Sequence, residues 1–276
     1  PIWSKKSIDG YFDKVGLTPL MGSGAYKVGT IDAGRAITYV RDPNYWGAKP
    51  DAGVVVNVGR YNFDQIKYVY YQNPEVAFEG FKSGEYFFRA ENKARTWSTG
   101  YNFPAVKAGM ITKAQIANNN PVPMQAIVMN LRRPIFQDIR VRQAMTLAYD
   151  FEWLNKTMFY GQYERLQSFF HGSALAATGT PTPQELAVIN PLLPDLEPIQ
   201  RQAVLSDWQA PKSTGDGFNR DNLLKARELL LQAGFKYQNM KLYQPNGQPA
   251  KLEFLSADDK NARIVLPFLR NLQRLG

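Results

Sequence analysis

The C-terminal end of the chain carries the pattern that most restricts its fold. Leu252, Phe254 and Leu255 have the spacing of a short strand, and apolar residues at helical spacing follow them. These are Ile264, Val265, Phe268, Leu269, Leu272 and Leu275. A helix with so apolar a face needs a partner surface, and a strand followed by a helix is the first part of a βαβ unit. The pattern predicts an α/β protein, and because the second strand does not follow, it predicts a piece of a longer chain.

Residues 25–31 and 36–41 predict a β-hairpin near the start of the chain. The turn between them is Asp32-Ala33-Gly34, whose residue types tolerate the backbone angles of a tight turn. Residues 29–36 also have the glycine spacing of a phosphate-binding loop. Arg35 and Ala36, however, stand where that loop needs a lysine and a hydroxyl, so a hairpin turn is the better interpretation.

A strand, a helix and a second strand are predicted next. Residues 66–71 alternate apolar and polar side chains, and Pro74 opens a helix. After the break at Ser83-Gly84, the aromatic run Tyr86-Phe87-Phe88 predicts another strand. This order predicts a parallel pair, because a helix is the usual connection between parallel strands.

Residues 124–130 predict a further strand, and we place a lobe boundary at its end. The first region comprises residues 1–130 and the second comprises residues 131–276. Helices dominate the second region.

In the second region, helix signals alternate with breakers. Asp138 predicts a helix N-cap, and Asp150 predicts an interruption before another helix. Residues 173–217 hold many prolines and predict loops with short helical turns. A longer helix begins near Asp221 and ends at Gly234, with Leu223, Leu224, Ala226, Leu230 and Leu231 predicted to be buried.

Composition excludes several classes of chemistry. The chain has no cysteine and one histidine, His171, which excludes disulfides, iron–sulfur clusters and thiol catalysis and leaves little for a metal centre. We therefore predict no cofactor, no metal and no catalytic residue. No apolar run approaches the roughly 20 residues of a membrane helix. The net charge of +9 is spread along the chain, which argues against a nucleic-acid-binding arm.

Two alternative functions remain open at this stage. Carboxylate pairs such as Asp258 with Asp259, or Glu75 with Glu79, are compatible with a hydrolase, although neighbouring acidic residues are normally solvated. A basic cluster is compatible with a module that binds anionic partners, although pairing with Asp138 or Glu152 explains it better. The cluster comprises Arg132, Arg133, Arg140 and Arg142.

Large aromatic side chains gather in a polar loop between residues 95 and 103. Trp97, Tyr101 and Phe103 either cap the edge of a core or line a ligand cleft, because exposed flat rings are unfavourable. Arg95 is able to hold a carboxylate or a phosphate by a bidentate contact. We predict Arg95, Trp97 and Tyr101 as ligand-binding residues.

Four motifs together resemble the bacterial extracellular solute-binding proteins of the oligopeptide, dipeptide and nickel type. Residues 21–26 resemble the family's Gly-Ser/Thr-Gly-Pro-Tyr signature, and residues 41–46 resemble its Arg-Asn-Pro-x-Tyr-Trp signature. Residues 77–86 resemble its helix and turn before a strand. Asn130 with residues 136–144 resembles its Asn…Phe-x-Asp-x-Arg-Val-Arg-x-Ala segment. Further segments are similar to the subgroup that serves microcin C and oligopeptide uptake.

The resemblance implies a two-lobed α/β architecture of the type II periplasmic-binding-protein kind. Family members are about twice as long, so residues 1–130 correspond to the middle of the first lobe and residues 131–276 to the N-terminal portion of the second. It further implies a monomeric periplasmic receptor, not an enzyme, that closes on an oligopeptide ligand and delivers it to the permease subunits of an ABC importer. Microcin C-like and murein peptides are implied as cargo.

The resemblance also places residues 124–130 at the entry to the crossing between lobes. Gln125, Ile127, Met129 and Asn130 are therefore predicted to face the ligand on the hinge side. Ordinary strand packing remains the alternative for each of them, since most residues of a crossing strand build the core.

Overall fold

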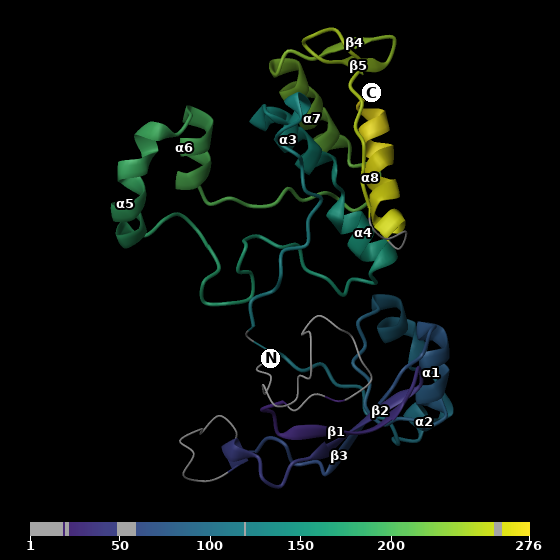
Figure 1. Ribbon diagram of the computed structural model, residues 1–276. Coiled ribbons are helices and arrows are strands. Elements are labelled where there is room, and N and C mark those ends of the chain that lie inside the picture. Colours follow the sequence, from purple (N-terminus) through teal and green to yellow (C-terminus); the bar gives the residue numbers. More distant parts are fainter. Residues whose placement is uncertain (1–18, 20–21, 49–58, 119, 257–260) are drawn as a thin grey trace. The chain divides into compact units, whose positions relative to one another are not determined.

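The computed structural model describes residues 19, 22–48, 59–118, 120–256 and 261–276 (Figure 1). The chain divides into two compact units, Pro1–Ala90 and Glu91–Gly276. The lobe boundary at residue 130 stays a prediction, because this division does not test where the lobes of a longer protein meet. Met21 of the first motif and the pair Asp258 and Asp259 lie outside the described residues. No described helix has the length and apolar character needed to span a membrane.

The first unit contains a three-stranded antiparallel sheet in the order β1-β2-β3 (Figure 1). Its strands are β1 (Tyr26–Asp32), β2 (Ala36–Arg41) and β3 (Gln65–Val69). The predicted hairpin is confirmed, and Gly34 at its turn has a φ of +74°, which glycine adopts without steric cost. The register of β1 against β2 shifts between Val28 and Thr30, so Gly29 lies in a bulge. A short 3₁₀ turn, η2 (Trp46–Ala48), follows β2.

Helix α1 (Pro74–Lys82) begins at Pro74, as predicted. The Asn73 side chain accepts hydrogen bonds from backbone amides of its first turn. The predicted strand at residues 86–88 is wrong. The Glu85 amide returns to the Gly80 carbonyl at 2.9 Å, and the Tyr86 hydroxyl donates to the Ala77 carbonyl at 2.6 Å. The segment therefore folds back onto α1, and the parallel pair does not form in the described residues.

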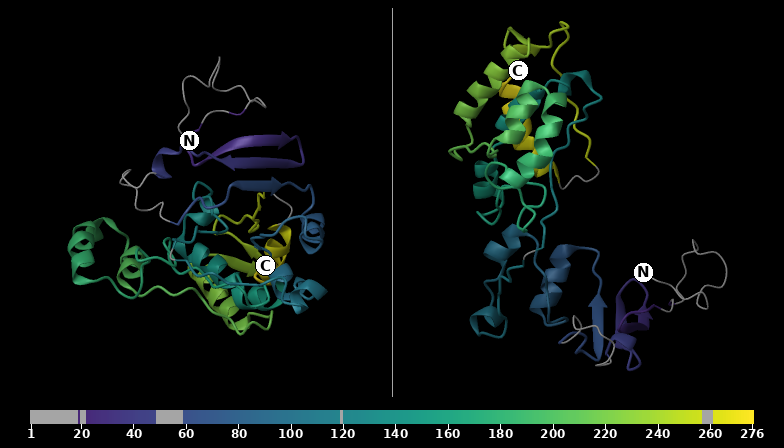
Figure 2. Two further views of the ribbon diagram at one scale, coloured as in Figure 1. Left: turned by 90° about the horizontal axis from the view of Figure 1, so that it is seen from below. Right: turned by 90° about the vertical axis from the view of Figure 1, so that its left-hand side faces the viewer.

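Four helices contribute buried side chains to the second unit. They are α3 (Ile139–Ala148), α4 (Phe151–Met158), α7 (Arg220–Gln232) and α8 (Ala262–Arg274). Helix α3 packs against both α7 and α8, as Figure 1 shows, and the right-hand view of Figure 2 again shows α7 and α8 next to each other. The contacts are close because Ala144, Ala148 and Ala226 are fully buried at them. Leu230 and Phe268 fill the space around these alanines.

The predicted helix boundaries are confirmed, but two side chains predicted to be buried are not. Asp138 caps α3, Asp150 caps α4, and Gly234 follows the end of α7 with a φ of +85°. Leu224 and Leu231 were predicted to be buried, but they are 49% and 47% exposed. The apolar face of α7 is narrower than predicted, because only one side of the helix contacts α3.

Residues 252–255 and 124–130 form no strand, so both predictions are wrong for the described residues. Leu252 and Phe254 still pack on the core, with the Phe254 ring 5.7 Å from the Phe268 ring. The sequence pattern did not predict the hairpin of β4 (Lys236–Gln238) and β5 (Lys241–Tyr243), whose Leu242 belongs to the same core.

The proline-rich region forms loops and short helices, as predicted. These are α5 (Pro183–Ile189), η6 (Asn190–Asp195) and α6 (Pro198–Leu205). Thr182 and Glu185 form a capping box at α5. The second unit also contains the turns η4 (Thr96–Gly100) and η5 (Pro134–Phe136) and the short helix α2 (Pro104–Lys107).

Candidate ligand-binding site

The structure brings the predicted aromatic residues together in one row. The Trp97 and Tyr101 rings lie 6.2 Å apart, and the Tyr101 and Phe103 rings lie 6.3 Å apart. The ammonium of Lys113 lies 4.2 Å from the Trp97 ring and donates to the Trp97 carbonyl. All three rings are half-buried, and none of them packs against the helical core of the second unit. This aromatic row is a partly exposed surface with a cation held on one face.

Arg95 lies at the start of the same turn but is not gathered into the row. Its side chain is exposed, and among the described residues its guanidinium forms no ion pair or hydrogen bond. Its carbonyl accepts a hydrogen bond from the Thr99 hydroxyl at 2.9 Å, which holds the π-helical turn η4. The guanidinium is therefore available to an anion close to the aromatic row.

The predicted hinge-side residues lie on a segment without regular secondary structure. Gln125, Ile127 and Asn130 are exposed, whereas Met129 packs against the helical core. Among the described residues, the backbone of residues 124–129 forms no hydrogen bond. Asn130 is already engaged in a turn, since its side-chain oxygen accepts from the Arg132 amide at 3.1 Å.

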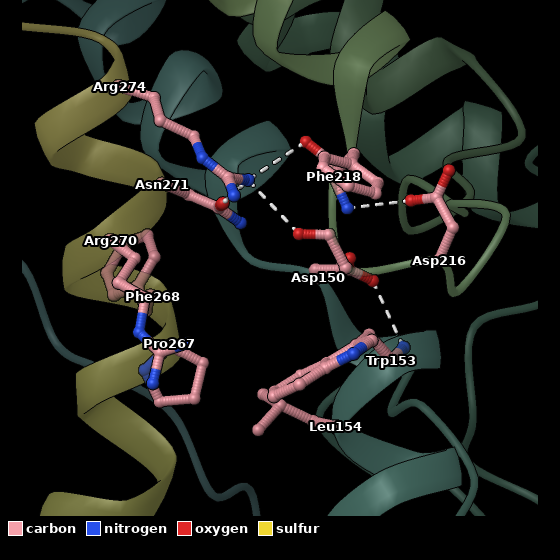
Figure 3. A pocket seen from close by; sticks show the side chains of 11 residues that line it. Asp150, Trp153, Leu154, Asp216, Phe218, Pro267, Phe268, Arg270, Asn271 and Arg274 are labelled. Atoms are coloured by element: carbon pink, nitrogen blue, oxygen red, sulfur yellow. Dashed lines mark hydrogen bonds between the residues drawn. The ribbon is translucent and has the colours of Figure 1, made fainter.

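A pocket of about 180 Å³ opens among α4, the loop before α7, and α8 (Figure 3). Asp150 and Trp153 contribute from α4, Asp216 and Phe218 from the loop, and Arg274 from α8. The sequence pattern did not predict that these residues lie close together, because they are far apart in the chain. Asp150 was recognised only as a helix interruption.

Hydrogen bonds fix the walls of the pocket. One Asp150 oxygen, Oδ1, accepts from the Trp153 amide at 3.1 Å and from the Ser213 hydroxyl at 2.5 Å. Nη1 of Arg274 donates to the carbonyls of Gly217 and Phe218 at 3.0 and 3.2 Å. It also donates to the Asn271 side chain at 3.0 Å, as Figure 3 shows. The guanidinium thus ties α8 to the loop before α7.

Asp216 stands at the exposed side of this pocket. Its Oδ1 accepts from the Phe218 amide at 2.7 Å, and this hydrogen bond lowers the pKa of Asp216. The carboxylate is therefore ionised at neutral pH and holds the turn that presents Phe218.

Arg165 is a second cation that the sequence patterns did not single out. Its guanidinium lies 5.1 Å from the Tyr149 ring and 5.7 Å from the Phe151 ring. Nη1 is buried and has no hydrogen-bond partner among the described residues, and burial lowers the pKa of Arg165. The loop that carries it is fixed by Asn155, whose amide donates to the Tyr163 carbonyl at 2.7 Å.

The remaining candidates have ordinary structural partners. Glu79 pairs with Lys82 at 2.8 Å on an exposed helix face, as expected for a solvated carboxylate. Arg140 pairs with Asp138 at 2.6 Å, and Arg133 pairs with Glu253 at 3.2 Å. The basic cluster therefore consists largely of paired side chains. In the part of the chain that the structure describes, no group of acidic and imidazole side chains is arranged to hold a metal ion.

Two curated proteins are similar to this chain in amino-acid sequence. A probable peptide-binding protein, YejA, of Agrobacterium fabrum is 39% identical over 263 residues, which is 94% of this chain and 42% of the relative. An uncharacterized protein, YejA, of Escherichia coli is 40% identical over 260 residues, again 94% of this chain and 42% of the relative. The chain thus spans less than half the length of these curated relatives.

A solved structure and a family model also match this chain. NikA from Brucella suis in complex with Fe(III)-EDTA matches with a TM-score of 0.58 and 19% identity, covering 92% of this chain and 42% of that one. This likeness confirms the predicted two-lobed α/β binding-protein fold. The family model described as bacterial extracellular solute-binding proteins, family 5 Middle, matches residues 3–276. The chain therefore belongs to the bacterial extracellular solute-binding proteins of family 5.

Proposed function

We propose that the longer protein containing this chain binds oligopeptides in the periplasm and delivers them to the permease of an ABC importer. It acts as a monomer and changes no covalent bond of its cargo. Support comes from the family and from the relative in Agrobacterium fabrum, whose name describes a probable peptide-binding protein. The observation that carries the proposal is the segment 124–129, whose backbone groups form no hydrogen bond with the described residues.

A peptide ligand matches this segment in chemistry. An extended peptide pairs its own N–H and C=O groups with a free strand edge, and this pairing is independent of the peptide's side chains. Gln125, Ile127 and Asn130 are exposed on or beside the segment 124–129, whose backbone would supply such groups. Recognition through the backbone therefore suits a receptor that accepts peptides of varied sequence.

The aromatic row supplies the second part of the proposed site. Flat rings such as Trp97 and Tyr101 make favourable contacts with many different side chains and lose little conformational entropy. Arg95 offers a guanidinium to a carboxylate of the ligand. Closure of the two lobes around the peptide then follows from contacts that each lobe makes to it.

Titration calorimetry of the full-length protein tests the proposal. We expect binding of peptides of three to ten residues, with microcin C-like and murein peptides as separate arms, and no binding of Ni²⁺ or an oligosaccharide. Trp97→Ala is expected to weaken peptide binding about tenfold or more, because a large aromatic contact is lost. Trp208→Ala removes a tryptophan that is 50% exposed and lies outside the aromatic row, so it is the matched control. Tight binding of a sugar or a metal, with none of any peptide, would refute the proposal.

Amide hydrogen exchange of the same protein tests this segment directly. Residues 124–129 are expected to exchange quickly without ligand and more slowly once a peptide is bound, because pairing protects the amides. Exchange that is equally slow without ligand would mean that another segment of the longer protein occupies this edge, and the backbone-pairing role would be lost.

A further inference from the structure

Only one of the two carboxylate oxygens of the buried Asp150 forms hydrogen bonds with described residues. The residue is 5% exposed, and its Oδ1 caps α4 and accepts from Ser213. Its other oxygen, Oδ2, is buried and accepts no hydrogen bond from the described residues. A buried carboxyl oxygen without a partner is unfavourable, because it has lost its hydrogen bonds to water and gained none in return.

Capping alone does not require this charge. Serine, threonine and asparagine cap helices about as well as aspartate, and each of them does so with one neutral oxygen. The Oδ1 atom already performs the capping role at Asp150. The negative charge and the unpartnered Oδ2 therefore exceed what helix α4 needs.

The arginines around the pocket leave Asp150 unpaired. Nη1 of Arg274 makes its contacts with the carbonyls of Gly217 and Phe218 and with Asn271. Arg270 is exposed at the pocket wall and forms no ion pair with a described residue. Figure 3 shows both side chains extending from α8, with Arg274 turned toward the Gly217–Phe218 loop. The cation that would match Asp150 is thus not supplied by the pocket itself.

We propose that this pocket is a subsite for the lysine side chain of a bound peptide, with the ammonium placed at the Asp150 carboxylate. This inference rests on the proposed peptide-binding function. Leu154, Pro267 and Phe268 give the pocket apolar walls, which suit the four-carbon stem of lysine. The volume of about 180 Å³ has room for one extended side chain. The α-ammonium of a peptide fits less well, because the polar peptide group beside it would need partners that these walls do not offer.

Calorimetry of the full-length protein with paired peptides tests this subsite. The ligands are alanine-based pentapeptides that carry one lysine at each position in turn, and the same peptides with norleucine or Nε-acetyllysine instead. We expect the lysine peptide to bind about tenfold or more tightly than its norleucine partner at one position, because a charge-assisted hydrogen bond forms. Asp150→Asn keeps the capping oxygen and removes the charge, so it is expected to abolish this preference while binding of the alanine peptide persists. Asp221→Asn, an exposed carboxylate outside the pocket, is the control and keeps the preference.

Each outcome separates this inference from the function on which it rests. Equal binding of lysine and norleucine peptides by the wild-type protein would overturn the subsite and leave peptide binding intact. A lysine preference that survives in Asp150→Asn would also overturn it, as would a loss of affinity on N-terminal acetylation alone. If Asp150→Asn does not fold, the wild-type comparison of lysine, norleucine and Nε-acetyllysine decides the question. Binding of no peptide at all would refute both proposals.

Discussion

Replacing Gly217 by alanine should be much more harmful than replacing Gly247, although the two glycines share the same backbone geometry. Both have a φ of +81°. A Cβ atom at Gly217 would lie 2.7 Å from Nε1 of Trp153, whereas a Cβ at Gly247 would meet no atom within 4 Å. The pair therefore separates the cost of a steric clash from the cost of the backbone conformation.

The expected magnitude follows from these two terms. A left-handed conformation costs a non-glycine residue about 1–2 kcal/mol, and both variants carry this cost. Alanine also restricts the unfolded chain, which offsets about 0.4–1 kcal/mol in both variants. Only Gly217→Ala must in addition displace the Trp153 indole, and overpacking of this kind costs about 1–3 kcal/mol. The difference between the two variants is therefore about 1–3 kcal/mol.

Urea unfolding of the full-length protein, followed by tryptophan fluorescence, measures this difference. We expect Gly217→Ala to have the lower unfolding midpoint and a changed emission spectrum in the folded state, because the Trp153 indole moves. Gly247→Ala should keep the wild-type spectrum. Equal losses of stability in the two variants would show that the indole moves aside at no cost, and the close packing of Gly217 on Trp153 would be refuted.

Two further predictions concern the helical core and its caps. Leu230→Ala, at a side chain that is 1% exposed, should lower the free energy of unfolding by about 2–5 kcal/mol, whereas Leu224→Ala, at 49% exposed, should cost clearly less. Similar losses in urea unfolding would contradict the described orientation of α7. The hydrogen bond from Arg140 lowers the pKa of Asp138 below its ordinary value of 3.8, so the stability that this carboxylate contributes is present above 3.8 and is lost as the pH falls through the lowered value. Asp138→Asn keeps the capping oxygen and should make the free energy of unfolding less dependent on pH in this acid range; an unchanged acid dependence would refute the contribution of the pair.

The helices could be predicted from the sequence because their signals are local. Asp138 marks the start of α3, Asp150 the start of α4 and Gly234 the end of α7, and each acts on backbone groups within one helical turn. Even so, the sequence overestimated the buried face of α7. Periodicity alone does not tell how wide a stripe the neighbouring helix covers, so Leu224 and Leu231 were assigned to the core.

The candidate site could be predicted only where its residues are close together in the chain. Trp97 and Tyr101 are separated by one turn of η4, so their gathering was visible in the sequence. The pocket around Asp150 is lined by three elements that lie far apart in the chain, α4, the loop before α7, and α8. Its signal is a carboxylate oxygen without a partner, and this depends on the positions of Ser213 and Arg274 in space.

The strand predictions that failed have a common physical cause. Alternating apolar side chains specify which face of a segment is buried, but a strand also needs a partner for its backbone, and that partner lies elsewhere in the chain. Leu252 and Phe254 do face the core as their alternation requires, although no ladder forms beside them. Residues 124–129 hold the apolar run 126–129, and their backbone groups form no hydrogen bond among the described residues. A local apolar pattern therefore predicts burial better than it predicts strand pairing, because the partner of a strand is set by the fold of the rest of the chain.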